Sequence, residues 1–154
     1  MMIQLSSPVF TERLGYCVAR CIHPPSSVWL RGQLGAGKTT FCRGFIHAFK
    51  SNIRVKSPTY TLLESYATEN LTIHHFDFYR LTQSDELEYI GIREYFSDDS
   101  VCLIEWPENI GPKMLPPPQL EIILKYASVE EVRYATLRAI DKQLSENIQR
   151  EYLK

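Results

Sequence analysis

The sequence predicts an α/β fold in three layers, with a central mixed β-sheet flanked by helices. Strand-like and helix-like patterns alternate along the chain, short apolar runs typical of buried strands recur, and a glycine-rich turn joins one such run to a helix. With 154 residues the chain is long enough to bury a substantial core, so we expect a single domain over residues 1–154.

The first half of the chain predicts two helices around a strand. Apolar residues at helical spacing indicate a helix over 9–22, which ends in the proline-containing segment 23–27 because proline cannot continue a helix. Residues 28–30 are typical of a short buried strand, and an apolar stripe indicates a second helix over 38–49. The glycine-rich turn therefore lies between a strand and a helix.

The second half predicts further strands and two more helices. The runs 60–67 and 71–79 predict a β-hairpin, and residues 84–96 carry a helix start signal with Ser84 as N-cap. The remaining elements are a buried strand over 100–106, a proline-rich loop over 107–118, late strands within 119–126 and 131–140, and a polar helix over 141–153.

Charge and cysteine content limit the classes of partner. The formal net charge is −1, whereas a protein that binds nucleic acid through its own surface is expected to be basic, so we expect no DNA binding.

The four cysteines form no CxxC pair, which favours buried thiols in a reducing compartment, although Cys17 and Cys21 leave a metal or redox pair open. No signal sequence or membrane-length apolar run is seen, so we expect a cytoplasmic protein without a membrane partner.

The glycine-rich turn matches the phosphate-loop pattern G-x-x-x-x-G-K-[ST] in full, with Gly32, Gly37, Lys38 and Thr39 at its fixed positions. Glycines let backbone N–H groups approach phosphate oxygens, Lys38 is expected to reach the β- and γ-phosphates, and the Thr39 hydroxyl is expected to bind Mg²⁺. This predicts a P-loop NTPase-like fold. The predicted nucleotide-binding residues of the loop are Gly32, Gln33, Leu34, Gly35, Ala36, Gly37, Lys38, Thr39 and Thr40.

A magnesium site in such a protein also needs an acid at the end of a buried strand. Glu105 ends the apolar run "VCLIE", and Asp77 lies within the apolar run 71–79. Either acid could instead be a solvated carboxylate at a strand end. We assign Glu105 to the Mg²⁺ site with Thr39, and Asp77 to positioning water or to a supporting role. Lys38, Asp77 and Glu105 are thus the predicted catalytic residues.

Other residues have two interpretations each. Ser57 and Thr59 flank a proline and place two hydroxyls where a switch segment would approach the γ-phosphate, but a plain proline turn is the alternative. Arg80 either stabilises transition-state charge or forms a surface salt bridge, and Trp106 either packs in the core or contacts the site. His74 and His75 point to opposite faces of a strand, which disfavours a joint metal site.

The nucleotide is expected to be ATP, because the chain contains neither N-K-x-D nor T-K-x-D, the sequences that read guanine. No other base-reading motif is evident. The first helix, around Phe10 and Thr11, is placed to cover the base.

Five segments together carry a family resemblance: "GAGKTT", "VKSPTYTL", "HFDFYRL", "DELEYIGIREYF" and "LIEWPE". In this order and spacing they resemble the TsaE (YjeE) family, the bacterial ATPase of tRNA threonylcarbamoyladenosine biosynthesis. The resemblance runs from about residue 8 to residue 125, and the last ~30 residues match only in general pattern.

The resemblance implies a small cytoplasmic Mg²⁺-dependent ATPase that assembles with TsaD, the catalytic subunit, and TsaB. That complex transfers a threonylcarbamoyl group to the adenosine 3′ of the anticodon, and the ATPase contacts tRNA indirectly while its nucleotide cycle resets the complex between turnovers. It also implies phosphate binding by residues 35–40, Mg²⁺ ligation by Thr39 and Glu105, and a second acidic position at Asp77.

One residue departs from the family pattern, since Gln33 stands where the family usually has aspartate. If that aspartate acts as a base, hydrolysis here should be weaker; if it only orients the loop, little should change.

Two other functions fit a phosphate loop. A small-molecule kinase usually has a lid rich in arginine, whereas Arg80, Arg93, Arg133 and Arg138 are dispersed in this sequence. A nucleotide-dependent interaction switch with negligible catalysis would use the acidic segment 85–99 and the proline-rich loop 107–118 as partner surfaces.

Overall fold

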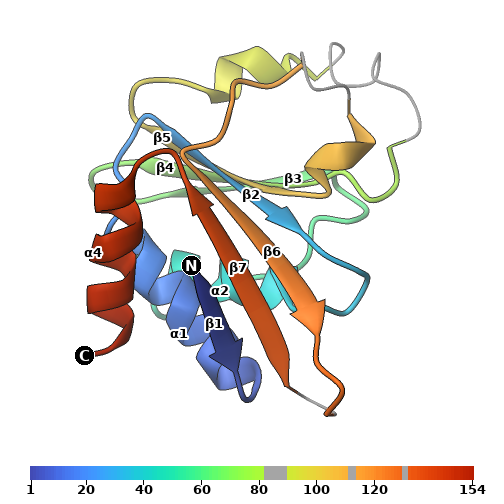
Figure 1. Ribbon diagram of the computed structural model, residues 1–154. Coiled ribbons are helices and arrows are strands. Elements are labelled where there is room, and N and C mark those ends of the chain that lie inside the picture. The colour runs from blue at the N-terminus through green and yellow to red at the C-terminus, as the bar shows by residue number, and fades with distance from the viewer. Residues whose placement is uncertain (82–89, 111–113, 130–131) are drawn as a thin grey trace.

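A mixed seven-stranded sheet forms the centre of the protein in a computed structural model that describes residues 1–81, 90–110, 114–129 and 132–154 (Figure 1). The strands are β1 (Met2–Leu5), β2 (Ser26–Arg31), β3 (Leu63–Ala67), β4 (Thr72–Asp77), β5 (Ser100–Glu105), β6 (Leu120–Tyr126) and β7 (Arg133–Ala139). The helices are α1 (Pro8–Ala19), α2 (Lys38–His47) and α4 (Lys142–Tyr152), with 3₁₀ turns η1 (Ile92–Tyr95) and η2 (Pro107–Asn109).

The strand order is β1-β7-β6-β2-β5-β4-β3. Strands β6, β2, β5 and β4 run parallel, whereas β3, β7 and β1 pair antiparallel with their neighbours, which confirms the predicted mixed sheet. Parallel strands bring their carboxyl ends to one edge, where ligands bind in open α/β sheets. In this register Glu105 lies opposite both Leu30 and Asp77, so the two predicted acids are neighbours at that edge.

Two apolar layers cover the sheet. Helices α1, α2 and α4 pack on one face over a core that includes Leu14, Phe41 and Phe45 (Figure 1). The opposite face carries a second apolar cluster, which includes Phe76 and Phe78 and is covered by η1, η2 and connecting segments. The three-layer α/β class predicted from the sequence is therefore confirmed, with the α-helices of the described ranges gathered on one face.

Helices α1 and α2 pack backbone to backbone. A Cβ atom on Gly15 would lie 2.1 Å from the carbonyl oxygen of Phe41, and one on Gly44 would lie 1.9 Å from that of Glu12. Such distances leave no room for a side chain at either crossing point. Close packing of these helices fixes α2, and with it the glycine-rich loop, against the rest of the domain.

Most element boundaries agree with the sequence prediction to within a few residues. The predicted hairpin is confirmed as β3 and β4, but β3 begins only at Leu63 because Leu62 adopts a positive φ of 69° within a turn. The edge strand β1 was not predicted. It is a four-residue strand near the N-terminus that pairs antiparallel with β7, which lies near the C-terminus of the chain.

The predicted helix over 84–96 needs a correction. Its residues 84–89, including the N-cap Ser84, lie outside the described residues. The described part contains the 3₁₀ turn η1, preceded by Gly91 at a φ of 64°. A left-handed residue interrupts an α-helix, so helical geometry does not continue unbroken to residue 96.

Candidate functional site

The glycine-rich loop connects β2 to α2 at the carboxyl edge of the sheet. Gly37 is the N-cap of α2 and has a φ of 104°, a conformation that residues with a Cβ atom rarely adopt. A Cβ atom on Gly32 would lie 2.4 Å from the carbonyl oxygen of Leu124 in β6. The loop is thus shaped by residues without side chains, and it leads into the first turn of α2, whose backbone N–H groups have no partner within the helix.

Lys38 is nearly fully buried, with 4% of its surface exposed, yet its ammonium has several partners. Its Nζ donates hydrogen bonds of 2.7 Å to the carbonyl oxygen of Gly32 and 2.9 Å to that of Gln33, and lies 4.0 Å from the ring centroid of Trp106. Burial lowers the pKa of Lys38 from its ordinary value, and the charge of Glu105 opposes that shift. The ammonium is held inside the loop by carbonyl oxygens and an aromatic face.

Glu105 lies at the end of β5 and is also buried. Its Oε1 accepts a hydrogen bond of 2.9 Å from the Thr39 hydroxyl and faces Nε2 of His75 at 2.8 Å. The predicted pairing of Thr39 with Glu105 is therefore present in the geometry. His75 was not predicted to take part, although it lies two residues before Asp77 on one strand and so shares its face.

Asp77, at the end of β4, holds the segment that follows α2. Its Oδ2 accepts hydrogen bonds from Thr59 Oγ1 at 2.6 Å and from Ser57 Oγ at 3.2 Å, while Oδ1 accepts one of 2.9 Å from the backbone amide of Tyr79. The two hydroxyls also lie 2.6 Å from each other. The predicted switch segment is thus attached to the second acid rather than lying apart as a simple turn.

These side chains converge on one cavity of about 170 Å³. Its lining is Leu34, Gly35, Gly37, Lys38, Thr39, Thr40, Ser57, Thr59, Asp77, Glu105 and Trp106. It combines an ammonium, a helix N-terminus, hydroxyls and two carboxylates, which suits a phosphate chain with a hard cation such as Mg²⁺. The chemistry of the donor set therefore fits a magnesium nucleotide.

A second cavity of about 250 Å³ adjoins the first along the loop. Its lining includes Thr11 of α1 and Arg133 of β7, and it shares Gly35, Gly37 and Thr40 with the first cavity. Thr11, predicted near the base, thus lies beside the loop and not among the phosphate-cavity residues. The guanidinium of Arg133 lies 4.1 Å from the ring centroid of Tyr126, an aromatic contact that supports this wall of the cavity.

Four further predicted residues do not line the phosphate cavity: Gly32, Gln33, Ala36 and Arg80. The Gln33 side chain is exposed on the β6 side of the loop, where it lines a separate cavity with Ile123 and Tyr126, and only its carbonyl contacts Lys38. Gly32 lines the same separate cavity as Gln33, and Ala36 is buried and lines the second cavity, which Thr11 also lines. Arg80 stacks on the exposed ring of Tyr60 at 4.1 Å and does not line the phosphate cavity.

Tyr126 is a further contact that the sequence did not indicate. Its hydroxyl donates a hydrogen bond of 2.6 Å to the carbonyl oxygen of Leu34 and so ties the end of β6 to the tip of the loop. The bond joins residues 92 positions apart, and no local motif could have predicted it.

Within the described parts of the chain, no helix is both long and apolar enough to cross a bilayer.

Comparison with known proteins gives one consistent result. The profile of the family "Threonylcarbamoyl adenosine biosynthesis protein TsaE" matches residues 5–135. A tRNA threonylcarbamoyladenosine biosynthesis protein TsaE from Haemophilus influenzae is 50% identical over 99 residues, which cover 64% of this chain and 62% of that protein. The protein of the same name from Bacillus subtilis is 37% identical over 134 residues, 87% of this chain and 82% of its own length.

A solved structure shows the same fold. The crystal structure of Bacillus subtilis YdiB superimposes with a TM-score of 0.81 at 30% identity, covering 97% of this chain and 94% of the other. The likeness therefore extends over almost the whole chain.

Proposed function

The chain belongs to the TsaE family, and from this premise we propose that it is a Mg²⁺-dependent ATPase in tRNA threonylcarbamoyladenosine biosynthesis. In this proposal it works in the cytoplasm with TsaD-like and TsaB-like proteins, and its nucleotide cycle sustains repeated turnovers of their complex. It meets tRNA only through those partners. The observation that carries the proposal is the convergence of Lys38, Thr39 and Glu105 on one cavity at the glycine-rich loop.

Lys38 is the phosphate-binding cation in this proposal. Its ammonium is held by the carbonyl oxygens of Gly32 and Gln33, so the loop keeps a positive charge at the cavity wall before any anion enters. Transfer of those hydrogen bonds to phosphate oxygens exchanges neutral acceptors for charged ones, which form stronger bonds. Residues 35–40 supply the backbone N–H groups for the same anion.

Thr39 and Glu105 are the proposed magnesium ligands. Their side-chain oxygens already meet at 2.9 Å, and both line the cavity. When bound, Mg²⁺ neutralises charge on the β- and γ-phosphate oxygens. The protein's part is to hold a hydroxyl and a carboxylate together at the first turn of α2, so that the ligands need little reorganisation.

Asp77 is proposed as a positioning residue for residues 57–59. Three donors of the chain already occupy its oxygens, so it acts as an anchor for the Ser57 and Thr59 hydroxyls. Those hydroxyls line the cavity opposite the loop. Entry of a γ-phosphate would compete for the same hydroxyls and couple the nucleotide state to the position of this segment.

The nucleoside is assigned to the second cavity, beside Thr11 and Arg133. This cavity continues from the phosphate site along Gly35 and Gly37, as an extended nucleotide requires. A kinase is disfavoured because, of the described arginines, none lines the phosphate cavity.

The test is reconstitution with TsaD-like and TsaB-like partners. We expect slow ATP hydrolysis by the chain alone, faster hydrolysis with partners, and threonylcarbamoylation over many turnovers only when ATP and the chain are both present. Lys38→Ala should lose ATP binding, whereas Lys50→Ala, which changes an exposed lysine, should not. Undiminished hydrolysis in Lys38→Ala, or modification that continues without the chain, would refute the proposal.

A further inference from the structure

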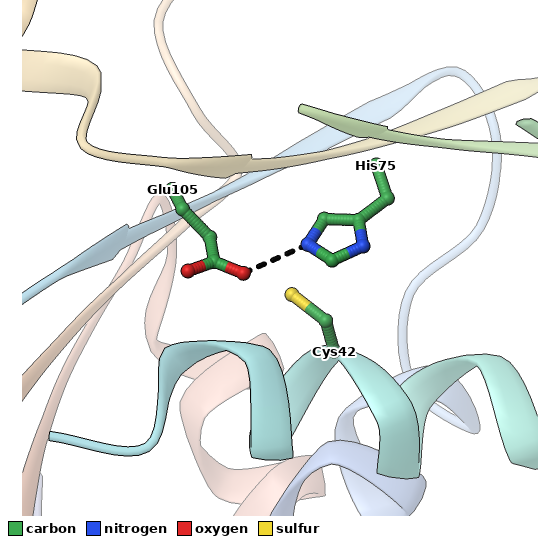
Figure 2. A group of neighbouring side chains, drawn as sticks. All are labelled: Cys42, His75 and Glu105. Atoms are coloured by element: carbon green, nitrogen blue, oxygen red, sulfur yellow. Dashed lines mark hydrogen bonds and ion pairs between the residues drawn. The ribbon is translucent and has the colours of Figure 1, made fainter. Parts of the chain in front are cut away.

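Three buried side chains meet beneath the phosphate cavity, between α2 and the sheet (Figure 2). Cys42 comes from α2, His75 from β4 and Glu105 from β5. Their potential ligand atoms, one from each residue, all lie within 4.8 Å of one another. Figure 2 shows the thiol directed toward the gap between the imidazole and the carboxylate.

The chemistry of this cluster differs from that of the cavity above it. Thiolate, imidazole and carboxylate are the ligands of Zn²⁺ and related cations, whereas Mg²⁺ prefers oxygen alone. At zinc–ligand distances of about 2.0–2.3 Å, ligand atoms around a tetrahedral ion are roughly 3–4 Å apart. The present spacing needs shifts of about 1 Å to reach that geometry.

We propose that Cys42, His75 and Glu105 form a binding site for a zinc-class divalent cation. The cation is coordinated by Cys42 Sγ, His75 Nε2 and one oxygen of Glu105, and a fourth position remains for water. The Cys42 thiol proton leaves to solvent as the sulfur–metal bond forms. His75 Nε2 gives up the proton that it donates to Glu105 Oε1 in the metal-free chain, and the ring of the metal-bound form carries its proton on Nδ1. Nδ1 is buried without a hydrogen-bond partner among the described residues, so the contact between Nε2 and Glu105 favours the other tautomer until the cation replaces it.

The phosphate cavity gives the cation a route to the cluster. Glu105 lines that cavity and also belongs to the cluster, while Cys42 lies about one helical turn beyond Thr39 on α2. A cation that enters beside Thr39 therefore meets the Glu105 carboxylate first. The imidazole and the thiol lie behind it, away from bulk solvent.

Glu105 makes the two metal sites mutually exclusive. Its Oε1 faces both Thr39 and His75, so a cation held by Cys42 and His75 removes the carboxylate from the proposed magnesium site. Zinc-class cations should therefore compete with Mg²⁺ and inhibit nucleotide hydrolysis. This consequence rests on the proposed function, but occupation of the cluster itself does not.

The experiment uses Co²⁺ as a spectroscopic probe on the purified chain without nucleotide. We expect one Co²⁺ per chain, with the absorption of a tetrahedral ion and a thiolate charge-transfer band, and displacement by Zn²⁺. Cys42→Ser should lose the thiolate band and weaken Zn²⁺ binding by at least about tenfold, since loss of even an outer partner of a metal site costs that much.

Cys102→Ser is the matched control. Cys102 is equally buried, but it lies in the apolar cluster on the opposite face of the sheet, with its thiol donating to the Tyr95 carbonyl oxygen. This variant should keep the band. Circular dichroism and a thermal melt establish that Cys42→Ser is folded, and Cys42→Ala serves as a second variant.

Absence of the thiolate band in the native chain would overturn the site, as would a band that persists in Cys42→Ser. Hydrolysis assays then test the competition separately. Zn²⁺ should inhibit the native chain and the Cys102→Ser variant but inhibit Cys42→Ser much less, while Mg²⁺-ATP hydrolysis without Zn²⁺ stays unchanged in Cys42→Ser. If Co²⁺ binds to the cluster but Zn²⁺ inhibits the native chain and both variants equally, the competition with Mg²⁺ is refuted while the metal site stands.

Discussion

The Thr39 hydroxyl donates a 2.9 Å hydrogen bond to Oε1 of Glu105, although 66 residues separate the two in the chain. Thr39 lies in the first turn of the helix that follows the loop, and Glu105 ends the neighbouring parallel strand. The sheet register brings them together before any ligand is bound. The bond marks the position that we propose for the metal ion.

Glu105→Gln should reduce the Mg²⁺ dependence of ATP binding. The amide keeps the shape of the side chain but removes the charge that attracts the cation, so we expect Mg²⁺ affinity to fall by about tenfold or more, ~1.4 kcal/mol. A Mg²⁺ titration with a fluorescent ATP analogue measures this. Glu108→Gln is the control, because Glu108 is a nearby exposed acid that pairs with Arg31; an equal loss in both variants would contradict the assignment.

His75→Ala should weaken Mg²⁺ binding more than it weakens binding of ATP without metal. The imidazole contacts Oε1 of Glu105 and limits its rotation, and outer partners of metal ligands typically contribute about 10–100-fold in affinity. His75→Gln, whose amide can reach the same oxygen, should recover part of the loss. Separate titrations of Mg²⁺ and of ATP distinguish this role from general destabilisation, which would lower both equally.

Gly44→Ala tests the packing that positions α2. Helix propensity alone predicts a gain of about 1 kcal/mol from this change. The added methyl group would instead lie 1.9 Å from the carbonyl oxygen of Glu12, so we expect a loss of roughly 1–3 kcal/mol in the free energy of unfolding. Urea denaturation measures it, and a stabilised variant would mean that the two helices are not in backbone contact.

The parts of the site that follow from local rules were predictable. The loop pattern pointed to Lys38 and Thr39, and the need for an acid at the end of a buried strand pointed to Glu105 and Asp77 as the acidic partners. The mixed sheet followed from alternating patterns. Each of these depends on a spacing that is visible in a short segment.

The remainder depends on tertiary contacts. Strand β1 is short, and of its residues only Leu5 is buried, so its pattern is weak and its pairing with β7 stabilises it. The 3₁₀ turn η1 begins after Gly91, which has a left-handed backbone conformation that no periodic pattern in the sequence predicts. Tyr126 meets the loop through the strand order alone, since β6 lies beside β2 in the sheet.

Gln33→Asp restores the residue that the resemblance places at this position, and it separates a chemical role from a structural one. The Gln33 side chain is exposed and lines a cavity with β6, while the phosphate cavity is lined by other loop residues. Lys38 uses only the carbonyl oxygen, which every substitution retains. We therefore expect hydrolysis with partners to change by less than about twofold, ~0.4 kcal/mol in the barrier. Gln33→Ala should change the rate of hydrolysis with partners by a similarly small factor. Turnover that rises tenfold with aspartate but not with alanine would show that an acid at this position takes part in the reaction.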